Sequence, residues 1–384
     1  MSHLGISRSE LEAKGAIHTA REIAQQPELW AKIAAALVLQ QKSISDFISA
    51  SKPARIILTG AGTSAFIGLS LRGIFQNQFG IVTDAISTTD IVSHPHDYLL
   101  RKEPTLLVSF ARSGNSPESA AAVALADTIC DACAHLIITC NPEGLLARQA
   151  VKGGKYVIVL PAEANDQSLA MTSSYTGMLL AGKLVAHCNA LNVVLPQVDL
   201  LCKYAEKSVQ YYAAELQQLA NVNFKRAVFL GSGPFYGTAT EAHLKLQELT
   251  DGQVICKNDS FLGFRHGPKA VVDSTTLVAY IFSNNQHALK YERDLVRTMH
   301  KGSTPLLEIG VGESKLPDIA LDHVFTYSEN GPAVDEGFLA VSSIVPFQML
   351  AFYKSLQLGL KPDTPSATGA ITRVVEGVNI YSIL

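Results

Sequence analysis

The sequence predicts an α/β protein built from two copies of one domain, each a parallel sheet with helices on both faces. Short apolar segments rich in β-branched residues alternate with helical segments, which is typical of parallel sheets covered on both sides. The segment RIILTGAG starts at residue 55, and the similar segment RAVFLGSG starts at residue 226. Three further pairs of apolar segments also stand about 170 residues apart, so the order of elements repeats.

Length and composition leave room for two domains. The chain has 384 residues, of which 47% are hydrophobic, enough for two sizeable cores. We expect an N-terminal helical segment over residues 1–50, a first domain over 51–198 and a second domain over 199–384. Charged residues make up 17% of the chain and the net charge is -3, with both signs mixed, so we expect no nucleic-acid partner.

The elements follow from the local pattern in chain order. Residues 7–50 are expected to form two helices, with Pro27 at a tolerated first-turn position of the second. Helices are then expected between successive apolar strands in both copies, and a helix over 200–220 bridges the copies. The expected strands begin at residues 55, 105, 135 and 155 in the first copy and at 226, 277, 305 and 323 in the second.

Cysteines, histidines and apolar stretches are interpreted as structural. Cys130 and Cys133 form a lone CxxC on an expected helix, and no second ligand pair follows at zinc spacing. His94 and His96 are expected in a surface turn, so no metal site is predicted. The longest apolar stretch is interrupted by Lys183, and the polar N-terminal segment does not resemble a signal peptide. We therefore expect a cytoplasmic protein without membrane contact.

Two loops at expected strand ends are rich in glycine and hydroxyl residues, TGAGTSAF at 59–66 and SFARSGNSPES at 109–119. A helix begins directly after each loop, and the unpaired N–H groups and partial positive charge of a helix N-terminus suit a phosphate. Because ligands of open α/β sheets bind at the carboxyl ends of strands, we predict one phosphate monoester held by both loops. The candidate binding residues are Gly62, Thr63, Ser64, Arg112, Ser113, Asn115 and Ser116.

Other interpretations of these loops remain open. The segment GAGTSA fits the dinucleotide fingerprint GxGxxA, and Asp84 lies at a suitable distance downstream, but a second serine-rich loop is not part of that design. A nucleotide P-loop requires a lysine, and none follows Gly62. Ordinary helix caps and turns also produce loops of this composition.

The second copy has poorer loops and a distinctive helix. Pro234 removes a backbone donor from its first loop, so we expect phosphate binding only in the first copy. In the helix GTATEAHLKLQELTDG, the spacing of Glu241, Lys245 and Glu248 predicts that they share one face. The loop FLGFRHGPKAVVD then holds His266 among glycines and a proline, where a histidine suits acid/base chemistry. A solvated helix face and a structural histidine are the alternatives.

Together, TGAGTSAF, SFARSGNSPES and EAHLKLQELT with FRHGPK resemble the sugar isomerase (SIS) domain family in its tandem form. The segment DTPSATGAITRVVEGV near the C-terminus extends the likeness over the whole chain, which is most similar to the AgaS group of amino-sugar-phosphate enzymes. The resemblance implies two tandem SIS domains, each a flavodoxin-like three-layer sandwich, and a phosphorylated sugar as the ligand.

The resemblance also implies roles for single residues. In the related isomerase half of glucosamine-6-phosphate synthase, a helix glutamate moves a proton between C1 and C2. The histidine of its KHGP loop assists ring opening and comes from the neighbouring subunit of a dimer. Glu248 and His266 match these positions, with Glu241 and Lys245 in support, so at least a homodimer is expected. The synthase forms an imine through a tail lysine, and Ala370 stands at that position here.

The reaction that the resemblance implies converts galactosamine 6-phosphate to tagatose 6-phosphate and ammonia. It requires proton transfer between adjacent carbons and hydrolysis of an imine, which is acid/base chemistry, so no cofactor is expected. A ketose/aldose isomerase that releases no ammonia and a non-catalytic phosphosugar sensor remain as alternatives, and a dehydrogenase is less well supported.

Overall fold

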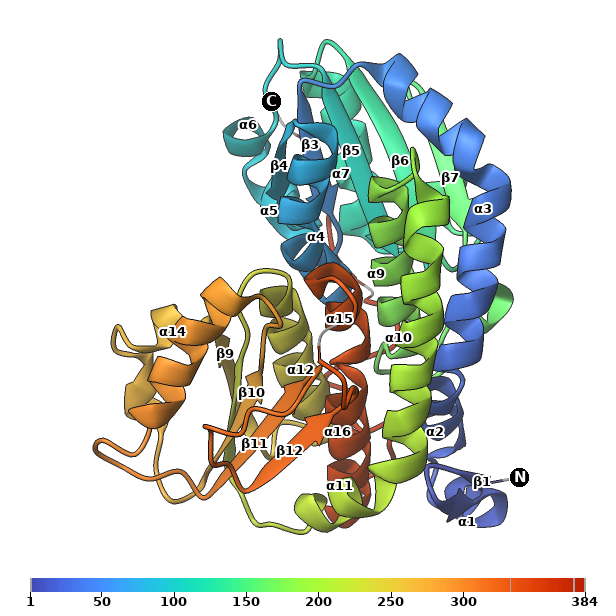
Figure 1. Cartoon of the computed structure of the whole chain (residues 1–384). Helices are drawn as coiled ribbons and strands as arrows, with labels where there is room; N and C mark the ends of the chain where they lie inside the picture. Colours follow the sequence, from blue (N-terminus) through green and yellow to red (C-terminus); the bar gives the residue numbers. More distant parts are fainter. Residues whose placement is uncertain (1, 332, 376, 383–384) are drawn as a thin grey trace. The chain divides into compact units, whose positions relative to one another are not determined.

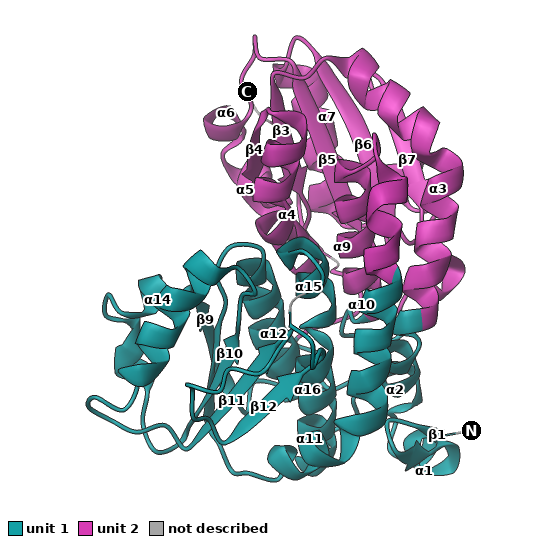
Figure 2. Cartoon of the chain, viewed as in Figure 1, with its two compact units in different colours: residues 1–27, 167–172, 199–370 teal, residues 28–166, 173–198, 371–384 magenta. Residues whose placement is uncertain are grey.

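The computed structural model describes residues 2–331, 333–375 and 377–382 (Figure 1). The chain divides into two compact units, coloured teal and magenta in Figure 2. Unit 1 comprises residues 1–27, 167–172 and 199–370, and unit 2 comprises residues 28–166, 173–198 and 371–384. Each unit contains one five-stranded sheet. The N-terminal segment is therefore shared between the units, and the C-terminal tail belongs to unit 2.

The sheet of unit 2 is fully parallel, with the strand order β4-β3-β5-β6-β7. Four of its strands coincide with the predicted apolar segments. The edge strand β4 was not predicted, because its sequence VTDA is short, polar and partly exposed. The strands are β3 (Arg55–Thr59), β4 (Val82–Ala85), β5 (Thr105–Ala111), β6 (Cys133–Thr139) and β7 (Lys155–Val159).

Helices cover both faces of this sheet, as the continuous burial of its central strands requires. On one face α4 packs on α9, and on the other α5 packs on α7 around a core that includes Ile57, Leu107 and Ile137. The helices are α3 (Gln26–Ser51), α4 (Thr63–Phe79), α5 (Thr88–Ser93), α6 (Pro95–Tyr98), α7 (Pro117–Ile129), α8 (Leu145–Arg148) and α9 (Ser173–Ala186).

The prediction that Cys130 and Cys133 lie on one helix is wrong. Helix α7 ends at Ile129, Cys130 follows it in an extended conformation, and Cys133 is the first residue of β6. Cys133 pairs with Thr105 in the sheet, so the strand register, rather than the helical pattern of the local sequence, determines where the helix ends.

Unit 1 repeats the same topology, with the parallel order β9-β8-β10-β11-β12. The repeat predicted from the sequence is therefore confirmed, and β9 is again an edge strand that the apolar pattern did not reveal. The strands are β8 (Arg226–Leu230), β9 (Ile255–Asp259), β10 (Thr276–Ile281), β11 (Leu307–Gly312) and β12 (His323–Thr326).

In unit 1, α12 packs on α15 and α16, whereas α13 packs on α14. A short hairpin of β1 (Ser2–His3) and β2 (Ile6–Ser7) precedes its helices. The helices are α1 (Arg8–Ala13), α2 (Ile17–Ala24), α11 (Ala213–Ala220), α12 (Phe235–Leu249), α13 (Phe261–Phe264), α14 (Gln286–Arg297), α15 (Glu336–Ser342) and α16 (Val345–Gln357), together with the part of α10 (Leu191–Tyr211) after residue 198.

One segment of the described chain, Glu336–Gln357, is apolar and long enough to cross a membrane by length and composition. It corresponds to α15 and α16, and 94% of its apolar window is buried inside the protein. Its apolar character is accounted for by its place in the core of unit 1, where it packs on α12.

Candidate active site

The first loop of unit 2 holds the N-terminus of α4 against the end of β3. A Cβ atom at Gly60 would lie 2.6 Å from the backbone carbon of Ser64, so only glycine permits this close approach. Gly62 has a φ of 55°, which favours glycine, and it immediately precedes the helix. Thr63 and Ser64 form the first turn of α4, whose N-terminal N–H groups suit an anion.

The second loop of unit 2 is held by its own polar groups. Gly114 has a φ of 65°, and the backbone N–H of Asn115 donates to Oγ of Ser113 at 3.3 Å. The side-chain oxygen of Asn115 accepts a hydrogen bond from the N–H of Leu145 at 3.0 Å. Asn115 therefore fixes the loop to the start of α8, while Ser116 stands at the N-terminus of α7.

The strand register brings the two loops together. Thr59 and Ser109, at the ends of β3 and β5, are direct partners in the sheet. The loops that follow them therefore start side by side at one edge of the sheet of unit 2, as the sequence predicted. Arg112, whose direction the sequence left open, is buried and donates from Nη2 to the backbone carbonyl of Arg373 in the C-terminal tail. The sequence interpretation did not single out Arg373, although it lies in the tail segment that resembles the AgaS group.

In unit 1, the helix α12 carries a buried cluster of charges. Lys245 Nζ lies 2.5 Å from Oε2 of Glu248 and 3.4 Å from Oε1 of Glu241, so these three side chains share one face. Glu241 and Lys245 are fully buried, whereas 22% of the Glu248 side chain is exposed. Glu248 is therefore the member of the cluster that can reach a ligand, and Lys245 holds its carboxylate in place.

The loop of His266 is attached to the end of α14. Lys269 Nζ donates to the backbone carbonyls of Thr298 at 2.6 Å and Lys301 at 3.2 Å, and Arg265 donates to Oγ1 of Thr298. Burial, with the charges of Arg265 and Lys301, lowers the pKa of Lys269. His266 itself is exposed and follows α13 in a turn, since its N–H donates to Gly263 O.

Within the described part of the chain, no hydrogen bond or ion pair joins His266 to Glu248. The structure thus assembles the carboxylate cluster of α12 and presents the histidine separately, on an exposed loop. The position of Ala370, where the related synthase has its lysine, is also exposed, and its N–H donates to Oγ1 of Thr368.

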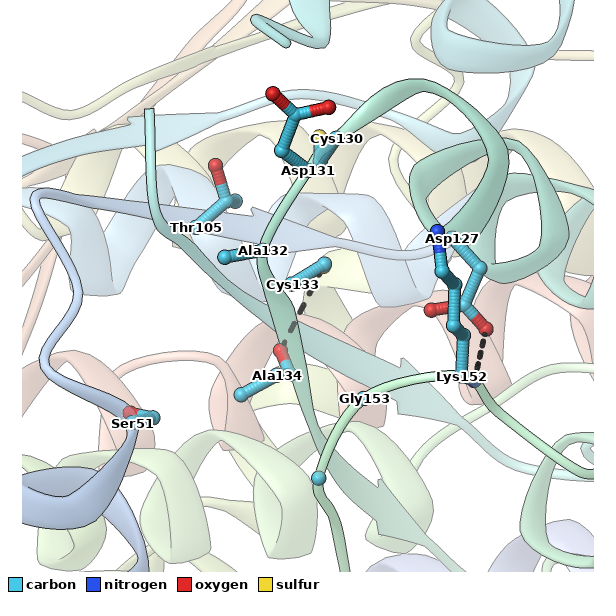
Figure 3. Close-up of a pocket in the computed structure, with 11 residues that line it drawn as sticks. Ser51, Thr105, Asp127, Cys130, Asp131, Ala132, Cys133, Ala134, Lys152 and Gly153 are labelled. Atoms are coloured by element: carbon cyan, nitrogen blue, oxygen red, sulfur yellow. Dashed lines mark hydrogen bonds between the residues drawn. The ribbon is translucent and has the colours of Figure 1, made fainter. Parts of the chain in front are cut away.

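A separate cavity of about 300 Å³ lies at the opposite, amino-terminal edge of the sheet of unit 2 (Figure 3). Cys130, Cys133 and Asp127 contribute to its lining. Burial raises the pKa of both thiols, which keeps them protonated and weakly nucleophilic. Asp127 accepts from the buried His135 at 2.9 Å and from the N–H of Lys152 at 2.8 Å, so its carboxylate is occupied in holding this edge together.

Comparisons with known proteins connect this architecture to phosphosugar enzymes. Residues 48–188 match the family model of the SIS domain. Over 99% of its length the chain is 42% identical to the D-galactosamine-6-phosphate deaminase AgaS of Shewanella sp. strain ANA-3, of which it covers 96%.

Solved structures also match the chain over nearly its whole length. A protein from Clostridium novyi NT, 38% identical, matches with a TM-score of 0.96 over 100% of both chains. The tagatose-6-phosphate ketose/aldose isomerase of Escherichia coli, 33% identical, matches with a TM-score of 0.86 over 95% of this chain and 97% of that one.

Proposed function

The chain belongs to the SIS domain family, in the group of the AgaS galactosamine-6-phosphate deaminases, and on that premise we propose that it is an amino-sugar-phosphate deaminase/isomerase. The proposed substrate is galactosamine 6-phosphate, and the products are tagatose 6-phosphate and ammonia. The observation that carries the proposal is on helix α12, where the partly exposed carboxylate of Glu248 is paired with the buried ammonium group of Lys245.

The loops of unit 2 are proposed to bind the phosphate. Thr63 and Ser64 stand at the N-terminus of α4 and Ser116 at that of α7, where helix dipoles and N–H groups favour a dianion, and Ser113 adds a hydroxyl from the loop before α7. These contacts leave the carbons of the sugar unaltered, so their contribution is to affinity and orientation.

The groups of unit 1 are proposed to move the protons. His266 assists ring opening, which exposes the C1 aldehyde. Glu248 removes the proton from C2, giving an enolamine, and returns a proton to C1. This leaves a hydroxymethyl group at C1 and an imine at C2, which water hydrolyses to the ketone and ammonia. Lys245 orients the carboxylate of Glu248 for the first step.

A role for His266 is consistent with its exposure on an anchored loop, and the resemblance to the synthase implies that this histidine acts in the active site of a neighbouring subunit. We therefore also propose that the protein forms at least a homodimer, that it acts in the cytoplasm, and that residues 51–198 and 199–384 are its two SIS domains.

Two measurements test the proposal. The protein is incubated with galactosamine 6-phosphate, glucosamine 6-phosphate and tagatose 6-phosphate, and ammonia and ketose are assayed together. Ammonia release with ketose formation supports the deaminase. Interconversion of tagatose 6-phosphate with an aldose, without ammonia from either amino sugar, supports the isomerase for which the Escherichia coli structure is named. Binding without turnover supports a sensor.

The substitution Glu248→Gln tests the assigned base. We expect kcat to fall about 10²–10⁴-fold, which is the usual contribution of a positioned general base, while the Kd for the phosphosugar changes little. The matched control is Glu206→Gln on the exposed side of α10, which should leave kcat unchanged. A Glu248→Gln enzyme with normal kcat would remove Glu248 from this role.

A further inference from the structure

A second arginine lies beside the phosphate loops of unit 2. Arg112 directly follows β5, and its buried guanidinium donates to the backbone carbonyl of Arg373. These two residues are separated by 261 positions in the sequence. The tail is thus attached to the same loop that carries Ser113 and Ser116.

The side chain of Arg373 is fixed in turn by the loop before α9. Its Nε donates to the backbone carbonyl of Asp166 at 2.9 Å, and its Nη2 donates to Oδ1 of Asn165 at 2.9 Å and to Asp166 O at 2.5 Å. A guanidinium that makes three hydrogen bonds is held in one orientation, which a lysine could not match.

The loop that receives Arg373 is itself rigid. Asp166 is fully buried, and its carboxylate accepts from the N–H of Ser174 at 2.8 Å, from Oγ of Ser174 at 2.5 Å and from Oγ of Ser173. Because Ser173 opens α9, this carboxylate anchors the loop to a fully buried helix. The position of Arg373 is therefore determined by the core of unit 2.

The electrostatics agree with this placement. Cys140 follows β6, next to the end of β5, and its thiol is buried. Burial and the carboxylate of Asp166 raise the pKa of this thiol, while the positive charges of Arg112 and Arg373 act in the opposite direction. Both guanidiniums therefore lie close enough to the end of β6 to act on a charge there, together with the carboxylate of Asp166.

We propose that Arg373 is a positioning residue for the phosphate-binding loop of unit 2, acting through Arg112. Its carbonyl holds the guanidinium of Arg112, the residue before Ser113, and its own guanidinium attaches the tail to residues 165–166. The inference rests on the proposed function, since it takes a phosphorylated ligand for granted. The physical gain is preorganisation: a long cationic side chain that is already ordered loses less entropy when the anion binds.

The test uses the full-length protein, with inorganic phosphate as the binding probe and galactosamine 6-phosphate as the substrate. We expect Arg373→Ala to raise the Kd for phosphate and the KM for the substrate about tenfold, because charge-assisted hydrogen bonds are lost, while kcat changes less than about threefold. Arg373→Lys should recover part of the affinity. The control is Val375→Ala, an exposed tail residue, which should leave both constants unchanged.

Asn165→Ala provides a milder version of the same change, since it removes one of the three hydrogen bonds of Arg373. It should raise the Kd for phosphate by less than Arg373→Ala does. If Arg373→Ala does not fold, Asn165→Ala and Arg373→Lys test the proposal in its place. An unchanged Kd for phosphate in these variants, or a loss of kcat at constant KM, would overturn the positioning role.

The outcomes separate this inference from the proposed function. Normal turnover of galactosamine 6-phosphate by the unmodified protein, with no effect of Arg373→Ala on affinity, refutes the inference alone. Weakened phosphate binding in Arg373→Ala, in a protein that turns over no hexosamine phosphate, supports the inference and refutes the function. An unmodified protein that neither binds phosphate nor turns over any hexosamine phosphate refutes both.

Discussion

The two sheets of this protein share a strand order and the glycines of their first loops, yet their carboxyl edges carry different side chains. Gly62 in unit 2 and Gly233 in unit 1 each have a positive φ, 55° and 57° respectively, and each lies just before a helix. After them, unit 2 continues with Thr63 and Ser64, whereas unit 1 continues with proline and the fully buried Phe235. The backbone of the loop is retained in both copies, and only unit 2 has hydroxyl side chains at the two positions that follow this glycine.

The carboxyl edge of unit 1 is occupied by a carboxylate of its own chain. Glu313 follows β11 and is almost fully buried. Its Oε1 accepts from the N–H groups of Ala333 at 2.8 Å and Val334 at 3.0 Å and from the hydroxyl of Tyr204 at 2.8 Å. Its Oε2 accepts from Asn284 at 2.5 Å. These polar donors at the carboxyl edge of unit 1 are thus satisfied within the chain.

The largest effect on stability is expected from removing this internal anion. In Glu313→Gln the amide oxygen can still accept from the N–H groups of Ala333 and Val334, but the NH2 group then faces the donating amide of Asn284. We therefore expect unit 1 to lose about 3 kcal/mol of unfolding free energy. Urea unfolding followed by hydrogen exchange of the β10 amides measures this. Glu143→Gln is the matched control, because Glu143 lies in the loop after β6 of unit 2 with its side chain 66% exposed. A loss below about 1 kcal/mol would contradict the internal-anion account.

A smaller effect is expected on phosphate affinity, which should depend on the carboxyl edge of unit 2 and not on that of unit 1. Ser64→Ala removes a hydroxyl at the N-terminus of α4, so we expect the Kd for inorganic phosphate to rise about tenfold. The equivalent loop of unit 1 contains Ser232, whose Oγ accepts from the N–H of Phe261 at 3.3 Å. Ser232→Ala should leave the Kd unchanged. Equal effects of the two substitutions, measured by isothermal titration calorimetry, would mean that the edges do not differ in phosphate binding.

The last comparison concerns pH and the acidic edge of unit 1. Burial raises the pKa of Glu292 from 4.5 to about 8, with a contribution from Glu336, against the hydrogen bond that Ser283 N–H donates at 2.9 Å. Between these two values the folded state keeps a proton that the unfolded chain releases. The unfolding free energy should therefore fall as pH rises from 5 to 8, by at most about 1.4 kcal/mol per pH unit.

The substitution Glu292→Gln should flatten this slope, because the neutral amide mimics the protonated acid. Hydrogen exchange of the β10 amides at pH 5, 6, 7 and 8 measures the slope for unit 1, and the β5 amides of unit 2 serve as an internal reference. The exposed Glu329→Gln is the control variant. A slope that is the same in Glu292→Gln and in the unmodified protein would assign the pH dependence to another group.

Much of the fold could be predicted because its evidence is local. The repeat, four strands in each sheet and the shared face of Glu241, Lys245 and Glu248 follow from periodicities that neighbouring residues impose on one another. The edge strands β4 and β9 escaped prediction because a strand that pairs on one side only needs less apolar sequence. The end of α7 before Cys133 escaped it because sheet register overrode the helical pattern.

The amino-acid sequence alone determined the duplicated α/β architecture, the glycine-dependent loops and the charged helix, since each depends on contacts within a few turns or strands of chain. Only the tertiary structure decided the direction of Arg112 and its link to Arg373, the burial of Glu313 among donors from separate segments, and the exposure of His266. The physical reason is that hydrogen bonds between distant residues are fixed by the packing of whole elements, and no local periodicity encodes that packing.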